Sequence, residues 1–215
     1  MVLRPLDWRW VAAKVVAHLA ALAPLALMVQ AALGDALGAD PIAALTHRTG
    51  DWTLRLLLAC LAMTPLRRVL RRPWPLRFRR LLGLYAFFYA SLHLSVYVVL
   101  DLNGYWAQVL TDLAKRPFIT VGFAAWLLLL PLAITSTRGW MRRLGRRWGQ
   151  LHRAVYVAAG LGVLHYFWLV KADLREPLAY AAVLALLLGF RVVAAWRARA
   201  APAGRWQFQP PMRGE

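Results

Sequence analysis

The stretch LHRAVYVAAGLGVLHYFWLV, residues 151–170, is an apolar run that carries two of the five histidines of the chain. A helix of this length, rising about 1.5 Å per residue, can cross the roughly 30 Å hydrocarbon core of a bilayer. His152 lies at its beginning and His165 near its end, so the two imidazoles would be about 20 Å apart along the axis. Ionisable side chains are costly inside a membrane and usually mark a cofactor, ion or substrate path. We therefore interpret the stretch as a membrane span with a functional role.

The composition is that of a polytopic membrane protein. Hydrophobic residues make up 61% of the 215 residues and charged residues 17%, and several apolar runs reach membrane length. The net charge of +18 does not indicate nucleic-acid binding, because the basic residues cluster between apolar runs. We expect no nucleic-acid partner and expect these clusters to contact membrane lipid. The single cysteine, Cys60, excludes an intrachain disulfide and a cysteine-ligated cluster.

The fold predicted for residues 1–215 is a single all-α domain, a six-transmembrane-helix bundle. Turn and helix-breaking residues separate the spans, among them Gly34, Pro73, Asn103, Pro117 and Pro177. The predicted spans are residues 11–33, 52–70, 81–100, 118–134, 151–170 and 178–195.

The arginines predict the orientation of the bundle. The segments between spans two and three and between spans four and five are rich in arginine and contain no acid, whereas the other three connections hold seven of the nine acids. By the positive-inside rule both termini and the two arginine-rich segments face the cytoplasm. The C-terminal segment adds Arg191, Arg197, Arg199, Arg205 and Arg213 to the basic side.

Two histidines are expected at one depth of the bundle. His93 lies 13 residues beyond Arg80, and His165 lies 14 residues beyond Leu151, where the fifth span begins. Both spans run outward, so the two side chains reach nearly the same level, toward the outer leaflet. Two imidazoles at one level on facing helices can be the axial ligands of a haem iron. The alternative is a pair of hydrogen-bonded histidines in the core of a bundle.

The depth argument does not pair the other three histidines. His152 lies some 140° from His165 around the helix, so the two need not serve one cofactor. His152 could ligate a second haem near the cytoplasm, contact a flavin or a haem propionate, or be a solvated interfacial histidine. His18, in the inner half of the first span, is a possible partner for His152, and His47 is expected in a solvated outer loop.

Three arginines at the inner mouth of spans three and five are candidate anion ligands. Arg79, Arg80 and Arg153 could pair with haem propionates or a flavin phosphate through charge-assisted hydrogen bonds. No Asp or Glu lies within spans two to six, which disfavours proton-coupled or divalent-metal transport, and no clustered zinc ligands are present. No phosphate-binding Gly-rich loop is present either, so redox partners would be separate chains.

Four longer stretches carry a family resemblance: LAMTPLRR (residues 61–68), RRLLGLYAFFYASLHLSVYVVLD (79–101), KRPFITVGFAAWLLLLPLAITS (115–136) and RRLGRRWGQLHRAVYVAAGLGVLHYFW (142–168). Through them the chain resembles, over nearly its whole length, the MsrQ (YedZ) family. These are the haem-binding membrane subunits of the bacterial periplasmic methionine-sulfoxide reductase system, within the ferric-reductase-like transmembrane group.

The resemblance implies a multi-pass b-type cytochrome of the bacterial inner membrane that binds haem b and FMN. It would form a heterodimer with a periplasmic molybdopterin-containing catalytic subunit, which reduces methionine sulfoxide in oxidised proteins. Its electrons would come from the quinone pool or a cytoplasmic flavin reductase. The haem histidines of the family correspond by motif to His93, His152 and His165. No motif marks the FMN site, and no catalytic residue is expected in this chain, which would be an electron-transfer subunit.

Two alternatives stay open on the sequence alone. A ferric or cupric reductase shares the scaffold but normally carries a cytosolic flavin and nicotinamide domain. A cofactor-free channel, transporter or assembly factor would use the histidines for packing or transport.

Overall fold

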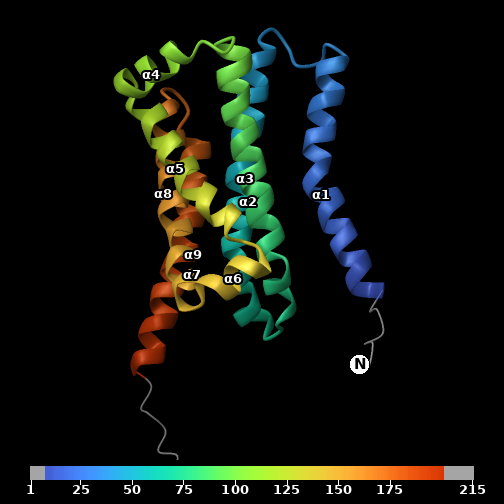
Figure 1. The fold of residues 1–215 in the computed structure, drawn as a ribbon, viewed down its shortest axis with the longest axis vertical. Coiled ribbons are helices and arrows are strands. Elements are labelled where there is room, and N and C mark those ends of the chain that lie inside the picture. Colours follow the sequence, from blue (N-terminus) through green and yellow to red (C-terminus); the bar gives the residue numbers. More distant parts are fainter. Residues whose placement is uncertain (1–7, 201–215) are drawn as a thin grey trace, which may run out of the picture.

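The computed structural model describes residues 8–200, and all regular secondary structure within this range is helical (Figure 1). The all-α prediction is thus confirmed for the described range, outside which Arg4, Arg205 and Arg213 lie. The long helices are α1 (Trp8–Leu33), α2 (Pro41–Leu70), α3 (Arg79–Ser95), α5 (Pro117–Ile134), α8 (Ala154–Leu169) and α9 (Arg175–Ala200). Shorter helices connect them: η1 (Trp74–Arg77), η2 (Val96–Asp101), α4 (Trp106–Lys115), α6 (Arg138–Leu144) and α7 (Arg146–Leu151).

Four helical segments are long and apolar enough to cross a membrane: α1, α3 continued by η2, α5, and α9. The other two long helices lie among them, with α2 packed most extensively against α3 and α8 against α5. Three connections lie at one end of the bundle: the one that contains α4, the one from α1 to α2 and the one from α8 to α9 (Figure 1). The short helices η1, α6 and α7 lie toward the other end. We call these the acidic end and the arginine-rich end.

Several boundaries differ from those predicted. Helix α2 begins at Pro41 rather than at residue 52, because the Asp40 side chain accepts a hydrogen bond from the Ala43 amide at 2.9 Å and Pro41 occupies the first turn. His47 therefore lies in a helix, and its placement in a loop was wrong, although its side chain is exposed. The predicted loop after residue 101 contains the amphipathic helix α4, whose Val109 is buried.

The stretch around His152 was also predicted as one continuous helix, which is wrong. Helix α7 ends at Leu151 and α8 begins at Ala154, so His152 lies in the turn between them. Gly145, with a φ of 50°, separates α6 from α7 in the same connection. The helical angle between His152 and His165 is therefore undefined, because no single helix joins the two residues.

The core lies where α2 packs against α3 and, less extensively, against α8, and small residues there allow the helices to approach closely. Ala86 on α3 and Ala158 and Ala159 on α8 are at most 1% exposed. Leu61 on α2 and Tyr89 on α3 belong to the same buried cluster and are fully buried. Close packing of these helices fixes the relative positions of the histidines that α3 and α8 carry.

Candidate functional site

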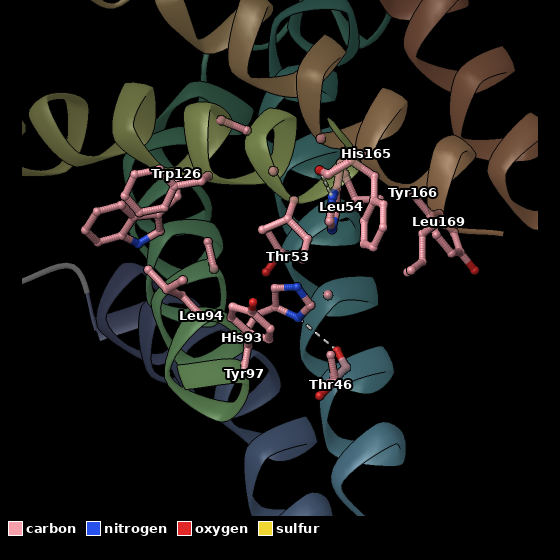
Figure 2. A pocket seen from close by; sticks show the side chains of 18 of the residues that line it. Thr46, Thr53, Leu54, His93, Leu94, Tyr97, Trp126, His165, Tyr166 and Leu169 are labelled. Atoms are coloured by element: carbon pink, nitrogen blue, oxygen red, sulfur yellow. Dashed lines mark hydrogen bonds between the residues drawn. The ribbon is translucent and has the colours of Figure 1, made fainter. Parts of the chain in front are cut away.

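A cavity of about 310 Å³ lies between α2, α3, α5 and α8, toward the acidic end (Figure 2). Its walls are mostly apolar, with Leu54, Leu57 and Leu129 among them, and its rim carries Asp101 and Arg116. Volumes of about 300–1,000 Å³ with apolar walls and few polar groups are typical of cofactor sites.

Two imidazoles project into this cavity from opposite helices. His93 comes from α3 and His165 from α8, and their ring centroids lie 6.1 Å apart with the ring planes at 80°. Figure 2 shows the two rings pointing toward the same space. Thr46 and Leu54 of α2 lie on one side of this space, and α8 lies on the other. The structure thus brings together the two histidines that the depth argument places at one level.

Each of the two rings is held by a backbone carbonyl oxygen. Nδ1 of His93 lies 2.9 Å from the Thr46 carbonyl oxygen, and Nδ1 of His165 lies 2.7 Å from that of Phe118. Since a carbonyl oxygen only accepts, each Nδ1 carries the proton, and Nε2 keeps a free lone pair. Metal-bound histidines use this arrangement, in which the donated Nδ1–H fixes the tautomer and the ring orientation.

Two glycines make room for the rings. Gly50 follows Thr46 by one helical turn, and a Cβ there would lie 3.3 Å from His93. Gly122 follows Phe118 in the same way, and a Cβ there would lie only 2.7 Å from Nδ1 of His165. Each histidine ring therefore packs directly against the backbone of the neighbouring helix.

The two halves of the site repeat one another. In both, 47 residues separate the acceptor carbonyl from its histidine, and a glycine follows the acceptor after four residues. Sequence reasoning missed Thr46, Gly50, Phe118 and Gly122. The equal spacing of the glycines and the histidines was the signal in the sequence that could have found them.

His152 belongs to a separate polar cluster. The Thr135 hydroxyl donates to the Pro131 carbonyl oxygen at 2.6 Å, so Nε2–H of His152, 3.1 Å away, must donate to Thr135. The His152 ring stacks on Trp148, with centroids 4.0 Å apart, and Trp148 Nε1 donates to the Thr135 carbonyl oxygen at 3.0 Å. His93 and His165 keep Nε2 free, whereas His152 keeps Nδ1 free for a ligand.

His18, a possible partner for His152, has its Nδ1 2.9 Å from the Tyr85 hydroxyl. The position on α3 that corresponds to His152, 13 residues before the cavity histidine, is Arg80. All five histidines lie within residues 8–200 that the structure describes, and among them only His93 and His165 have their rings against each other.

The three candidate anion ligands gather at the arginine-rich end. Arg79 is half-buried, whereas Arg80 and Arg153 are exposed. The Arg79 carbonyl oxygen accepts a hydrogen bond from Cys60 Sγ at 3.2 Å. Within residues 8–200, the ion pairs involve only arginines 55, 116 and 175, so none of these three is neutralised by a carboxylate.

The rim of the cavity at the acidic end is fixed by hydrogen bonds between tyrosines and carboxylates. The Tyr97 hydroxyl donates to Asp112 on α4 at 2.6 Å, and Gln108 donates to the same carboxylate at 2.8 Å. The Tyr97 hydrogen bond, together with that of Gln108 and the charge of Arg116, lowers the pKa of Asp112. These contacts hold α4 over the cavity.

Comparisons with known proteins point to one family. Residues 49–163 match the family described as ferric reductase like transmembrane component. The chain is 58% identical over 201 residues to a protein of Xanthomonas axonopodis pv. citri, covering 91% of this chain and 92% of the relative. It is 57% identical over 207 residues to one of Xanthomonas campestris pv. campestris, with 94% of each covered. It is 50% identical over 184 residues to one of Herminiimonas arsenicoxydans, with 84% of each covered. All three relatives are named protein-methionine-sulfoxide reductase heme-binding subunit MsrQ. No solved structure matches the chain.

Proposed function

Because the chain belongs to the ferric-reductase-like transmembrane family, we propose that it is the haem-binding membrane subunit of a methionine-sulfoxide reductase system. In this function it would be a b-type cytochrome, and Nε2 of His93 and Nε2 of His165 would bind the iron of a haem b. The observation that carries the proposal is that both rings donate Nδ1–H to a carbonyl and face one cavity.

The residues of the cavity fit a haem. The two rings face one largely apolar cavity with their centroids 6.1 Å apart, so both imidazoles could bind one iron held between them. When bound, haem supplies one-electron redox chemistry. The chain contributes the ligand geometry, and the apolar walls exclude water and so influence the reduction potential.

The charge distribution supports a defined orientation in the bacterial inner membrane. We propose that α2 and α8 also span the bilayer, which gives six spans with both termini in the cytoplasm. The arginines of α6, α7 and the η1 connection then lie on the cytoplasmic side, as the positive-inside rule requires. The acidic end, where the cavity of His93 and His165 has its polar rim, then faces the periplasm.

This orientation assigns the partners to opposite ends. A periplasmic molybdopterin-containing catalytic subunit would dock at the acidic end, form a heterodimer, and receive electrons for the reduction of methionine sulfoxide. Donors would act from the membrane or the cytoplasm, as the quinone pool or a flavin reductase. The names of the relatives support the assignment of the reductase system.

At the arginine-rich end we propose a second cofactor site around His152. Its free Nδ1 could bind a second haem iron, and Arg79, Arg80 and Arg153 could pair with haem propionates or with the phosphate of FMN. The absence of a neutralising carboxylate near these arginines, among the described residues, supports an anionic group there.

The test is the reduced-minus-oxidised visible spectrum of the purified protein, with haem and flavin quantified by extraction. We expect sharp b-type bands in the wild type and loss of most haem in His93→Ala and His165→Ala. His47→Ala, on the exposed rim of the same cavity, is the matched control and should keep its haem. A colourless wild type would contradict the proposal and favour a cofactor-free transporter. Rapid reoxidation by ferric chelate, but not by the catalytic subunit, would favour a ferric reductase.

A further inference from the structure

An exposed histidine lies on the surface of a helix that can cross a membrane, next to a half-buried tyrosine of the neighbouring helix. His18 occupies the middle of α1, is exposed, and has its Nδ1 2.9 Å from the hydroxyl of Tyr85 on α3. The two rings meet edge to face, with centroids 5.6 Å apart. A lipid-exposed histidine is costly, so this position calls for a functional explanation.

A shallow, largely open apolar groove, lined by residues of α1 itself, continues from His18 along the same side of this helix. Its lining residues follow His18 at helical spacing toward the acidic end: Leu22, Leu25, Ala26, Val29, Gln30 and Leu33. The side chains of Leu22, Val29 and Leu33 are among the exposed large hydrophobic residues. The surface of α1 therefore combines a long apolar track with one polar end.

This combination selects for a ligand with a long apolar tail and a small polar head. If α1 enters the bilayer near its first residue, Trp8, His18 lies about 15 Å along the axis from the bilayer surface, one turn beyond the exposed Lys14. Phospholipid head groups stay at that surface, whereas the head of an isoprenoid quinone is uncharged and enters the hydrocarbon region. Imidazole and phenol groups can each donate to a quinone oxygen or accept from a quinol hydroxyl.

We propose that His18 and Tyr85 bind the head group of a membrane quinone, and that the groove on α1 holds its isoprenoid tail. This rests on the proposed function, in which the quinone pool is one of the candidate donors. The site places the donor beside the helix that carries the haem ligand, because Tyr85 precedes His93 on α3 by two turns, about 12 Å.

Tyr89 connects the two levels and fixes α1 to the bundle. It lies on the same side of α3, one turn from Tyr85 and one turn from His93, and is fully buried. Its hydroxyl donates to the Ala21 carbonyl oxygen at 2.8 Å and accepts from the Leu25 amide at 3.1 Å. The groove and the head-group site are therefore held in register with the haem ligand.

The proposal is tested by photolabelling the haem-loaded protein in lipid nanodiscs with an azido-ubiquinone probe, followed by peptide mapping. We expect labels on α1 and α3 that excess decylubiquinone removes. His18→Leu and Tyr85→Phe should each weaken competition by decylubiquinone about tenfold, as expected for one lost hydrogen bond. Ala26→Trp should block the groove, whereas Ala20→Trp, exposed on the other flank of α1, is the matched control and should bind normally.

Haem content, measured in every variant, separates this inference from the proposed function. Equal competition in wild type, Tyr85→Phe and Ala26→Trp, all with full haem, would overturn the quinone site. Labels confined to other helices, or no specific label on a haem-loaded wild type, would overturn it as well and leave a flavin reductase as the donor. A wild type without haem would contradict the proposed function itself, whatever the labelling shows.

Discussion

A Cβ atom on Gly122 would lie 2.7 Å from Nδ1 of His165, closer than such atoms approach each other in real structures. The ring of His165 is thereby pressed onto α5, and its Nδ1 reaches the Phe118 carbonyl oxygen. Gly122 is thus part of the candidate haem site, although it offers no ligand atom. Its role is to leave the space in which the histidine ring is oriented.

Gly122→Ala should therefore abolish most haem binding. An added methyl group displaces the His165 ring from its carbonyl partner and misdirects Nε2. Gly50→Ala, where the corresponding distance is 3.3 Å, should reduce haem content less. The measurement is haem per protein after purification, together with the position of the reduced b-type bands.

The matched control is Gly160→Ala in α8, where an added Cβ meets nothing within 4 Å. Gly-to-Ala substitution in a helix normally stabilises by about 0.5–1 kcal/mol, so this variant should keep its haem and unfold at an equal or higher temperature. Full haem in Gly122→Ala would show that His165 does not need its contact with α5.

How far the sequence predicts this site depends on the kind of interaction. The common depth of His93 and His165 in the bilayer follows from the lengths of the spans and the positions of the arginines, because each span begins at a basic segment on the same side of the membrane. The carbonyl partners of their Nδ1 atoms do not follow, since they depend on which helix packs beside each histidine. The start of α2 was missed for a local reason: its first turns carry His47 and Arg48, and a search for apolar spans passes over polar helical turns.

His152→Ala should leave the haem of His93 and His165 in place. The two sites share no hydrogen bond, because His152 is bonded to Thr135 and stacked on Trp148. If His152 ligates a second haem, haem content should fall by about half and the remaining bands should be unchanged. Loss of all haem in this variant would contradict the separation of the two sites.

Arg191 compensates for a proline in α2. Pro65 lacks an amide hydrogen, so the Leu61 carbonyl oxygen has no helical donor, and the Arg191 guanidinium donates to it instead. Arg191→Leu should destabilise the protein by about 1–3 kcal/mol, since a buried acceptor loses its partner. Thermal unfolding in detergent measures the effect, and Arg197→Leu, exposed on the same helix, is the control.

A second substitution tests the cause of that loss. Pro65→Ala restores the amide donor within α2, so Arg191→Leu should cost less in the Pro65→Ala background than in the wild type. If the two effects simply add, Arg191 stabilises the protein through another contact, such as its position over the Tyr156 ring at 5.3 Å.

Asp112 should make the acidic end sensitive to low pH. Its pKa is lowered from the usual 3.8, first by the hydrogen bond from Tyr97, so folding favours the ionised form. A group whose pKa is lower in the folded protein than in the unfolded chain stabilises the fold. This stability is fully present above the pKa of the unfolded state and is lost as pH falls through the pKa of the folded state. Asp112→Asn should lower the unfolding temperature at pH 7, because the amide carries no charge to attract Arg116 and has only one oxygen to accept the hydrogen bonds that Tyr97 and Gln108 donate. As pH falls below 3.8 the unfolded chain takes up the proton first, so the difference between the two proteins should shrink, and it should vanish once pH falls through the lowered pKa of folded Asp112. A difference that stays constant from pH 7 to pH 3 would show that the charge of Asp112 does not hold α4 over the cavity.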